Sequence, residues 1–178
     1  MKPAREEAIS AEELAGRIFL WDGCDSSACD KLYHRTLLEN FRYPEGKVCE
    51  DVPVTYRIVL AAERVAVSDK PFYNYFHRSG SISTAAAITE KTFHFSRHTE
   101  EIYPYIRQHY PAIENQARYL RVRSLSHILL LLEQAEKDTR KQFSAALGAV
   151  AALRRNTIVD RVIMVITTAS ISMPSIHK

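Results

Sequence analysis

Glycine is scarce in this sequence, with five glycines among 178 residues, and neither GxGxxG nor GxxxxGK followed by Ser or Thr occurs to cradle a phosphate. Long runs of like charge are also absent, and 24 Lys and Arg side chains against 21 Asp and Glu leave a net charge of only +3. This balance argues against a protein that coats nucleic acid, so we expect no nucleic-acid partner. The first residues lack the apolar stretch of a secretory signal, and a cytoplasmic location is expected.

Cysteine is scarce as well. Cys24, Cys29 and Cys49 are an odd number in a chain without a recognisable signal, which argues against a disulfide scaffold. Together with His34 they could form a zinc site, but structural zinc sites usually have closely spaced cysteine pairs. Free cysteines that pack as small apolar side chains are the simpler interpretation. We therefore expect no metal site among them.

The remaining composition is that of a globular protein, with 46% hydrophobic and 25% charged residues. A chain of this length forms one ordinary domain or two very small ones. Ser10, with Glu13 three residues later, is a capping-box start that predicts a helix to about Leu20. A short helix is predicted over residues 35–40, and Asp51 is placed to begin a third helix.

Two later segments, residues 64–67 and 72–76, are β-branched or aromatic and have a turn sequence between them. This pattern predicts two short strands. From Thr89 onward the pattern becomes helical, and it predicts a helix that breaks near Pro104 and ends before Pro111.

The last part of the chain continues this helical character, with a helix expected over about residues 112–136 and another over 139–155. The apolar stripe of the first of these consists of Val122, Leu125, Leu129 and Leu132. The apolar run at residues 162–166 is too short to span a membrane. Overall the sequence predicts an α+β fold that is mainly helical, with a mixed segment over residues 1–88 and a helical tail over 89–178.

Glu50 and Asp51, at the start of the predicted third helix, are candidates for chemistry. Exposed first-turn amides and the helix dipole hold a carboxylate there in its ionised form, which can accept a proton from a hydroxyl. Ordinary helix capping by Asp51 is the alternative interpretation. Arg78 could bind a phosphate or lie in a solvated loop. Lys31 and Tyr33 alternate along the chain in a way typical of the polar face of a strand.

Five sequence blocks occur in a recognisable order: ACDKLY at residues 28–33, FRYPEGK at 41–47, EDVPVTYR at 50–57, KPFYNY at 70–75 and RSGSI at 78–82. These blocks resemble the second half of family 2 glycosyltransferases of the GT-A fold, above all the bacterial enzymes that build capsule, exopolysaccharide and cell-wall polymers. The resemblance covers about residues 25–85 and depends on several ordered blocks rather than on one motif.

The resemblance implies a glycosyltransferase that moves a sugar from a nucleotide sugar to the hydroxyl of a saccharide acceptor, with inversion by direct displacement. It assigns roles to Asp51 and Glu50 in catalysis, Arg78 and Ser81 (or Ser83) at the donor diphosphate, and Lys31 and Tyr33 on the acceptor side.

The sequence departs from the family on the donor side. The family's first half carries a parallel nucleotide-binding sheet and an Asp-x-Asp motif that holds a divalent metal, Mn or Mg, with the nucleotide sugar. Neither is found in this sequence, and Phe76 stands where the family often has Arg. We therefore expect a fragment without a cofactor of its own, inactive when isolated.

A further expectation follows from the missing sheet. Some apolar side chains would pack on that sheet in the complete family fold, and without it we expect them to be exposed and to favour self-association. They are Val52, Val59, Tyr73 and Tyr75. The alternative to an enzyme is a non-catalytic helical interaction module that contacts the inner face of a membrane. The basic residues available for such a contact are Arg118, Arg121, Arg123, Arg154 and Arg155.

Overall fold

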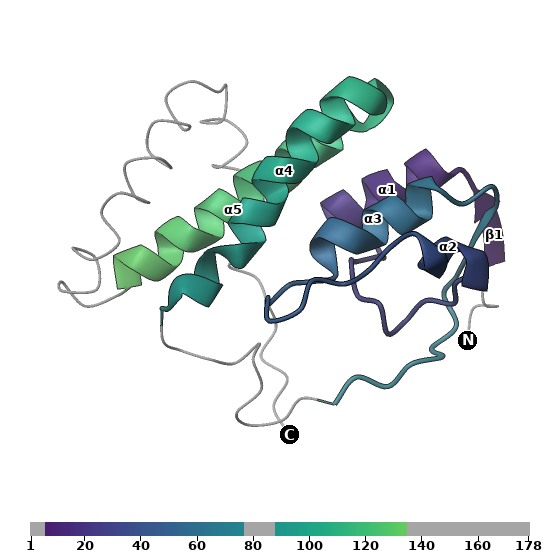
Figure 1. The fold of residues 1–178 in the computed structure, drawn as a ribbon, viewed down its shortest axis with the longest axis horizontal. Coiled ribbons are helices and arrows are strands. Elements are labelled where there is room, and N and C mark those ends of the chain that lie inside the picture. Colours follow the sequence, from purple (N-terminus) through teal and green to yellow (C-terminus); the bar gives the residue numbers. More distant parts are fainter. Residues whose placement is uncertain (1–5, 77–87, 135–178) are drawn as a thin grey trace. The chain divides into compact units, whose positions relative to one another are not determined.

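The structure, a computed structural model, describes residues 6–76 and 88–134 (Figure 1). Among these residues the fold is mainly helical with one small sheet, which confirms the predicted α+β, mainly helical class. Among the described residues, those up to Ser124 belong to one compact unit and those from Leu125 belong to a second. The predicted helix over 139–155 and the apolar run at 162–166 lie outside the described residues.

Helix α1 (Ala11–Leu20) begins where the sequence predicts. The Ser10 hydroxyl accepts a hydrogen bond from the backbone N–H of Glu13 at 3.0 Å, which satisfies one of the free first-turn amides. The helix ends at Trp21, which adopts a left-handed conformation with φ of 57°. Ile18 and Phe19, on its buried face, enter the hydrophobic core.

Helix α2 (Arg35–Glu39) is short and buries no residue, whereas α3 (Val52–Leu60) is a core helix. Tyr56 and Ile58 are 1% and 0% exposed. Val52 and Val59 are buried as well, so the expectation that they are exposed is wrong. The reason is that α3 packs on both α1 and α4 (His94–His109), which cover the apolar side chains that a further sheet would otherwise cover.

The sheet consists of β1 (Glu6–Ile9) and β2 (Val65–Ser68), paired antiparallel with Ile9 opposite Val65. The strand predicted at residues 64–67 is thus confirmed. The second predicted strand is wrong, because residues 72–76 form no strand and Phe72 and Phe76 are 80% and 79% exposed.

The choice of strand partner has a physical reason. Ile9, Val65 and Val67 pack against the core, so pairing β2 with β1 buries one face of the sheet. Tyr73 and Tyr75, which were expected to be exposed, are 49% and 62% exposed.

Helix α4 follows a short 3-10 helix, η2 (Glu90–Phe93), and ends before Pro111 as predicted. The predicted break at Pro104 is wrong, since the helix runs through this residue. Proline removes one backbone hydrogen bond. Ile102 and Ile106, on either side of Pro104, are 1% and 0% exposed in the core, and their burial offsets that loss.

A second 3-10 helix, η3 (Pro111–Ile113), leads into α5 (Glu114–Gln134). The predicted apolar stripe is wrong: Val122, Leu125 and Leu129 are only partly buried, and the Leu132 side chain lies outside the described part. The buried residues of α5 are Ala117, Leu120, Ser124 and Ile128. Ser124 is small and buried, and its hydroxyl lies 2.7 Å from the hydroxyl of Thr99 on α4.

Candidate functional site

Asp51 lies at the N-cap position of α3, as predicted, but its side chain makes no capping hydrogen bond. Its backbone is already helical, with φ of −70° and ψ of −34°, and its carbonyl oxygen accepts hydrogen bonds from the N–H groups of Val54 and Thr55. A capping aspartate normally has an extended backbone that turns its carboxylate toward the first-turn amides. The capping interpretation of the side chain is therefore wrong, which leaves the carboxylate for another role.

The electrostatic environment of Asp51 also differs from the expectation. Burial of this half-buried carboxyl raises its pKa, and the neighbouring charges of Glu50 and Asp25 act in the same direction. The backbone N–H groups of Val52 and of Asp51 itself oppose this effect without outweighing it. Instead of being held firmly ionised, Asp51 has a pKa shifted toward the range in which a carboxylate accepts a proton efficiently near neutral pH.

Lys31 lies in the irregular segment that precedes α2, not on a strand as its alternation with Tyr33 indicated. Its Nζ donates to the Ser27 carbonyl oxygen at 2.7 Å and to Asp30 Oδ1 at 2.6 Å, and lies 3.9 Å from Asp25 Oδ1. The side chain is only 14% exposed. Asp25 therefore lies near both the Lys31 ammonium and the Asp51 carboxylate, which brings two of the predicted site residues into one neighbourhood.

Thr55 attaches this segment to α3. Its hydroxyl donates a 2.7 Å hydrogen bond to the Ser26 carbonyl oxygen, one helical turn after Asp51. Thr55 also acts on the pKa of Tyr33, whose hydroxyl is thus close to the start of the helix. The structure consequently gathers Asp51, Lys31 and Tyr33 around the first turn of α3.

A pair of tyrosines completes this neighbourhood. Burial raises the pKa of Tyr33, and the adjacent Tyr43 acts in the same direction, so Tyr33 stays protonated at any physiological pH. Both hydroxyl oxygens are shielded from solvent, and neither makes a hydrogen bond of good geometry to the described residues. Sequence reasoning placed Tyr43 in a turn and missed it as a site residue, because only the fold brings it beside Tyr33.

His94 and His98, on α4, are a second pair that the sequence did not indicate. Nδ1 of His94 accepts a hydrogen bond from the backbone N–H of Val48 at 3.1 Å. Both imidazoles are buried, at 7% and 9% exposed, and burial lowers the pKa of each. Their spacing of four residues places them on one helix face, and a pair of histidines on the core side of a helix is the signal that could have found them.

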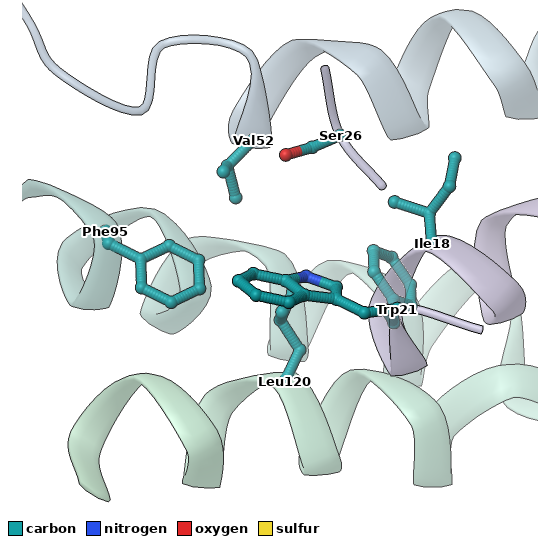
Figure 2. A pocket seen from close by; sticks show the side chains of 7 residues that line it. Ile18, Trp21, Ser26, Val52, Phe95 and Leu120 are labelled. Atoms are coloured by element: carbon teal, nitrogen blue, oxygen red, sulfur yellow. The ribbon is translucent and has the colours of Figure 1, made fainter. Parts of the chain in front are cut away.

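A small, mainly apolar pocket adjoins the polar residues around Asp51, since Val52 and Ser26 are among the residues that line it. Figure 2 shows Trp21 between Phe95, Leu120 and Val52, with Ile18 nearby. Its cavity volume is about 10 Å³, room for roughly one water molecule. The Arg123 guanidinium lies 3.4 Å from the centre of the Trp21 ring. This pocket is far too small for a sugar or a nucleotide.

The donor side predicted from the sequence cannot be located, since Arg78 and Ser81 lie outside the described residues. Within residues 6–76 and 88–134, no group of three or more His, Cys, Asp or Glu side chains is arranged to hold a metal ion. The described residues therefore do not fit the divalent ion that the resemblance implies. The three cysteines are free thiols: Cys24 is half-buried against the core, whereas Cys29 and Cys49 are exposed, so the expectation that the cysteines pack as apolar side chains is wrong for these two.

The arginines considered for a membrane contact are engaged within the protein where they are described. Arg121 makes two 2.7 Å hydrogen bonds to Glu100, and Arg118 makes one of 2.8 Å to Glu114. Arg123 stacks on Trp21. Arg154 and Arg155 lie outside the described residues. Over the described ranges, the helices are all too short or too polar to cross a membrane.

Comparison with known proteins gives one partial similarity. A stretch of 68 residues, 38% of this chain, is 38% identical to Glycosyltransferase GlyA of Streptococcus pneumoniae serotype 4 and covers 10% of that protein. No protein family and no solved structure matches the chain. The similarity shows a relation to a glycosyltransferase over part of this chain. The matched part spans only about a tenth of that relative's length.

Proposed function

We propose that this chain is the acceptor side of an inverting glycosyltransferase of family 2 with a GT-A fold, of the bacterial polysaccharide type. The observation that carries the proposal is the Asp51 side chain, which occupies a helix start without capping it and has a raised pKa. The partial identity to a glycosyltransferase and the ordered sequence blocks around Asp51 support the same function.

In the proposed reaction, Asp51 accepts the proton of an acceptor hydroxyl. The acceptor oxygen forms a bond to the anomeric carbon of the donor sugar, and the bond from that carbon to the nucleoside diphosphate breaks. Attack from the face opposite the leaving group inverts the configuration. Glu50 contributes through its charge, which raises the pKa of Asp51 and so makes it a stronger base once ionised.

Tyr33 and Lys31 are assigned to the acceptor side. The protonated Tyr33 hydroxyl has no well-formed hydrogen bond within the described part of the chain, and it can both donate to and accept from a sugar hydroxyl once the segment that shields it from solvent moves aside. Lys31 has a different task, because its ammonium is already bound to Ser27 and Asp30. Its contacts stabilise the bend of residues 25–31, which precedes Tyr33.

The donor side belongs to parts that the described residues do not include. In the proposal, Arg78 and Ser81 contact the diphosphate, and a second domain or polypeptide supplies the nucleotide-binding sheet and the carboxylates for Mn or Mg. A nucleotide-sugar donor and a growing polysaccharide place the protein in the cytoplasm or at the inner face of the membrane. On its own, the chain is expected to transfer no sugar.

The proposed function is tested by titrating the full chain with a panel of bacterial saccharide acceptors and monitoring binding by NMR. A saccharide acceptor is expected to shift the amide resonances of residues 25–33 and 50–55. Tyr33→Phe removes one hydroxyl and keeps the ring, so it should weaken binding by about tenfold or less, the effect of one hydrogen bond. Tyr119→Phe on α5, away from these segments, serves as the matched control.

Calorimetry with manganese and uridine diphosphate tests the missing donor side in the same preparation. Only weak binding is expected. Tight, metal-dependent nucleotide binding would contradict the assignment of this chain to the acceptor side alone. A panel in which every saccharide leaves residues 25–33 and 50–55 unshifted would contradict the acceptor site itself.

A further inference from the structure

His94 is joined directly to the segment that leads into Asp51. Its Nδ1 accepts a hydrogen bond from the Val48 backbone N–H at 3.1 Å, across 46 positions of sequence. Only a neutral imidazole, with its proton on Nε2, can accept a hydrogen bond at Nδ1. The contact between α4 and this segment therefore requires one protonation state of one side chain.

The segment from Val48 to Asp51 is short and sharply bent. Cys49 adopts the left-handed conformation, with φ of 55°, and its carbonyl oxygen accepts the Val52 N–H at 3.2 Å. The Asp51 carbonyl oxygen is in turn fixed by the Val54 and Thr55 amides. With the helix side of this bend held by α3, the backbone position of Val48 decides how the chain enters the helix and where the Asp51 carboxylate lies.

His98 lies beside His94, one turn further along α4. The two imidazole rings lie 6.4 Å apart, centre to centre. The backbone of Val48 acts on His98 and raises its pKa, against the larger lowering effect of burial. The backbone of Val48 thus donates a hydrogen bond to His94 and also acts on the pKa of His98.

We propose that His94 is a positioning residue for Asp51, which holds residues 48–51 through the Val48 N–H as long as its imidazole is neutral. This inference rests on the proposed function only in that Asp51 is the base of the reaction. The structural part of the inference, a histidine that controls the environment of the Asp51 carboxyl, stands on the contacts alone.

The dependence on pH follows from the charges around the pair. The groups that act on His94 are Lys47, Arg97 and Lys91, which lower its pKa, and Glu90, which raises it. His98 is affected by Glu101, which raises its pKa, and by His94 and Lys47, which lower it. Since the folded pKa of His94 lies below its ordinary value of 6.5, the contact is complete above pH 6.5 and is lost as the pH falls through the folded pKa.

The test uses the full chain and NMR spectroscopy over pH 4.5–8, at about half-unit steps. Three quantities are followed: the imidazole titration of His94, hydrogen exchange at the Val48 amide, and the carboxyl titration of Asp51. In the wild type, protection of the Val48 amide is expected to disappear in step with protonation of His94. His94→Asn keeps an acceptor at the position of Nδ1 and cannot be protonated, so protection should persist at low pH.

His94→Phe keeps a ring but removes the acceptor. It should lose Val48 protection at every pH, and the pKa of Asp51 should move down toward its ordinary value as the segment becomes solvated. His109→Asn, fifteen positions further along α4 and exposed, is the matched control and should behave as the wild type.

Two outcomes would overturn the inference. One is a Val48 amide that stays protected in the wild type after His94 is protonated. This result needs only the wild-type protein, so it can be obtained even if His94→Phe does not fold. The other is an identical Asp51 titration in the wild type, His94→Asn and His94→Phe. Neither readout depends on sugar binding or transfer, so a failure here is distinguishable from a failure of the acceptor-binding experiment.

Discussion

The helical core and the segment over residues 22–51 are built in different ways. The core helices α1, α3 and α4 meet through fully buried apolar side chains such as Phe19, Tyr56 and Ile106. Residues 22–51 include no buried residue and are attached by polar contacts, among them Thr55 to Ser26 and Val48 to His94. A site attached by a few hydrogen bonds to a rigid scaffold can adjust locally without unfolding the core.

The two regions should differ most in how much the free energy of unfolding falls when a side chain is truncated. Ile106 is 0% exposed, and Ile106→Ala should lower the free energy of unfolding by about 2–5 kcal/mol through lost burial and a cavity. Leu32, in the other region, is fully exposed, and Leu32→Ala should change the free energy of unfolding by less than about 0.5 kcal/mol. Urea denaturation measures both, and similar losses would contradict the comparison.

Removal of the polar contact inside the core should cause a smaller loss in the free energy of unfolding. The Thr99 hydroxyl lies 2.7 Å from that of Ser124 and 2.9 Å from the Ser96 carbonyl oxygen, all buried. Thr99→Val keeps the shape of the side chain but removes these hydrogen bonds, and should cost about 1–3 kcal/mol of unfolding free energy. Thr36→Val at an exposed position is the control. An unchanged denaturation midpoint in Thr99→Val would show that α4 and α5 do not need this contact.

The attachment of residues 22–51 to α3 can be tested separately from the core. Thr55→Val removes the hydrogen bond to the Ser26 carbonyl oxygen and should lower the free energy of unfolding by about 0.5–1.5 kcal/mol. Amide hydrogen exchange should become faster in residues 22–31 while α1 and α4 keep their protection. Equal acceleration in the core helices would mean that the two regions open together.

Removal of the Asp51 charge should have a small effect of opposite sign, an increase in the free energy of unfolding. Its pKa in the folded state is above the ordinary value of 3.8, so its ionisation disfavours the folded state. Stability contributed by the neutral form is present below pH 3.8 and is lost as the pH rises through the folded pKa. Asp51→Asn should remove this pH dependence and raise stability at pH 7 by less than about 1 kcal/mol, because the group is only half-buried.

Asp51→Ala separates this explanation from helix capping. Loss of a capping side chain costs about 1 kcal/mol, whereas the structure predicts no loss at pH 7, since the carboxylate makes no capping bond. Urea denaturation from pH 3 to pH 8 distinguishes the two, and a clear destabilisation of Asp51→Ala at pH 7 would restore the capping interpretation.

The smallest effect on stability is expected outside both regions, at the exposed aromatic residues that follow β2. Phe72 and Phe76 are 80% and 79% exposed, and side chains of this kind favour association. Phe72→Ser with Phe76→Ser should reduce self-association in light scattering while the denaturation midpoint changes little. A wild-type chain that is monomeric at micromolar concentration would contradict self-association.

Much of the local structure could be predicted from the sequence, whereas the site could be predicted only in part. The start of α1 at Ser10, the position of Asp51 before α3 and the end of α4 before Pro111 all depend on residues within one helical turn. The sequence block around Asp51 indicated this residue as a candidate. The sequence did not indicate that the Asp51 side chain makes no capping hydrogen bond, because the backbone angles at Asp51 depend on how residues 48–51 are held.

The sequence by itself determined where helices begin and end and that the fold is mainly helical, because caps and helical periodicity act over a few neighbouring residues. The tertiary structure alone decided that β2 pairs with β1, that Pro104 stays inside α4 and which face of α5 is buried. It also placed Tyr43 beside Tyr33 and His94 against Val48. Each of these depends on contacts between residues distant in sequence, whose energies appear only when the helices pack.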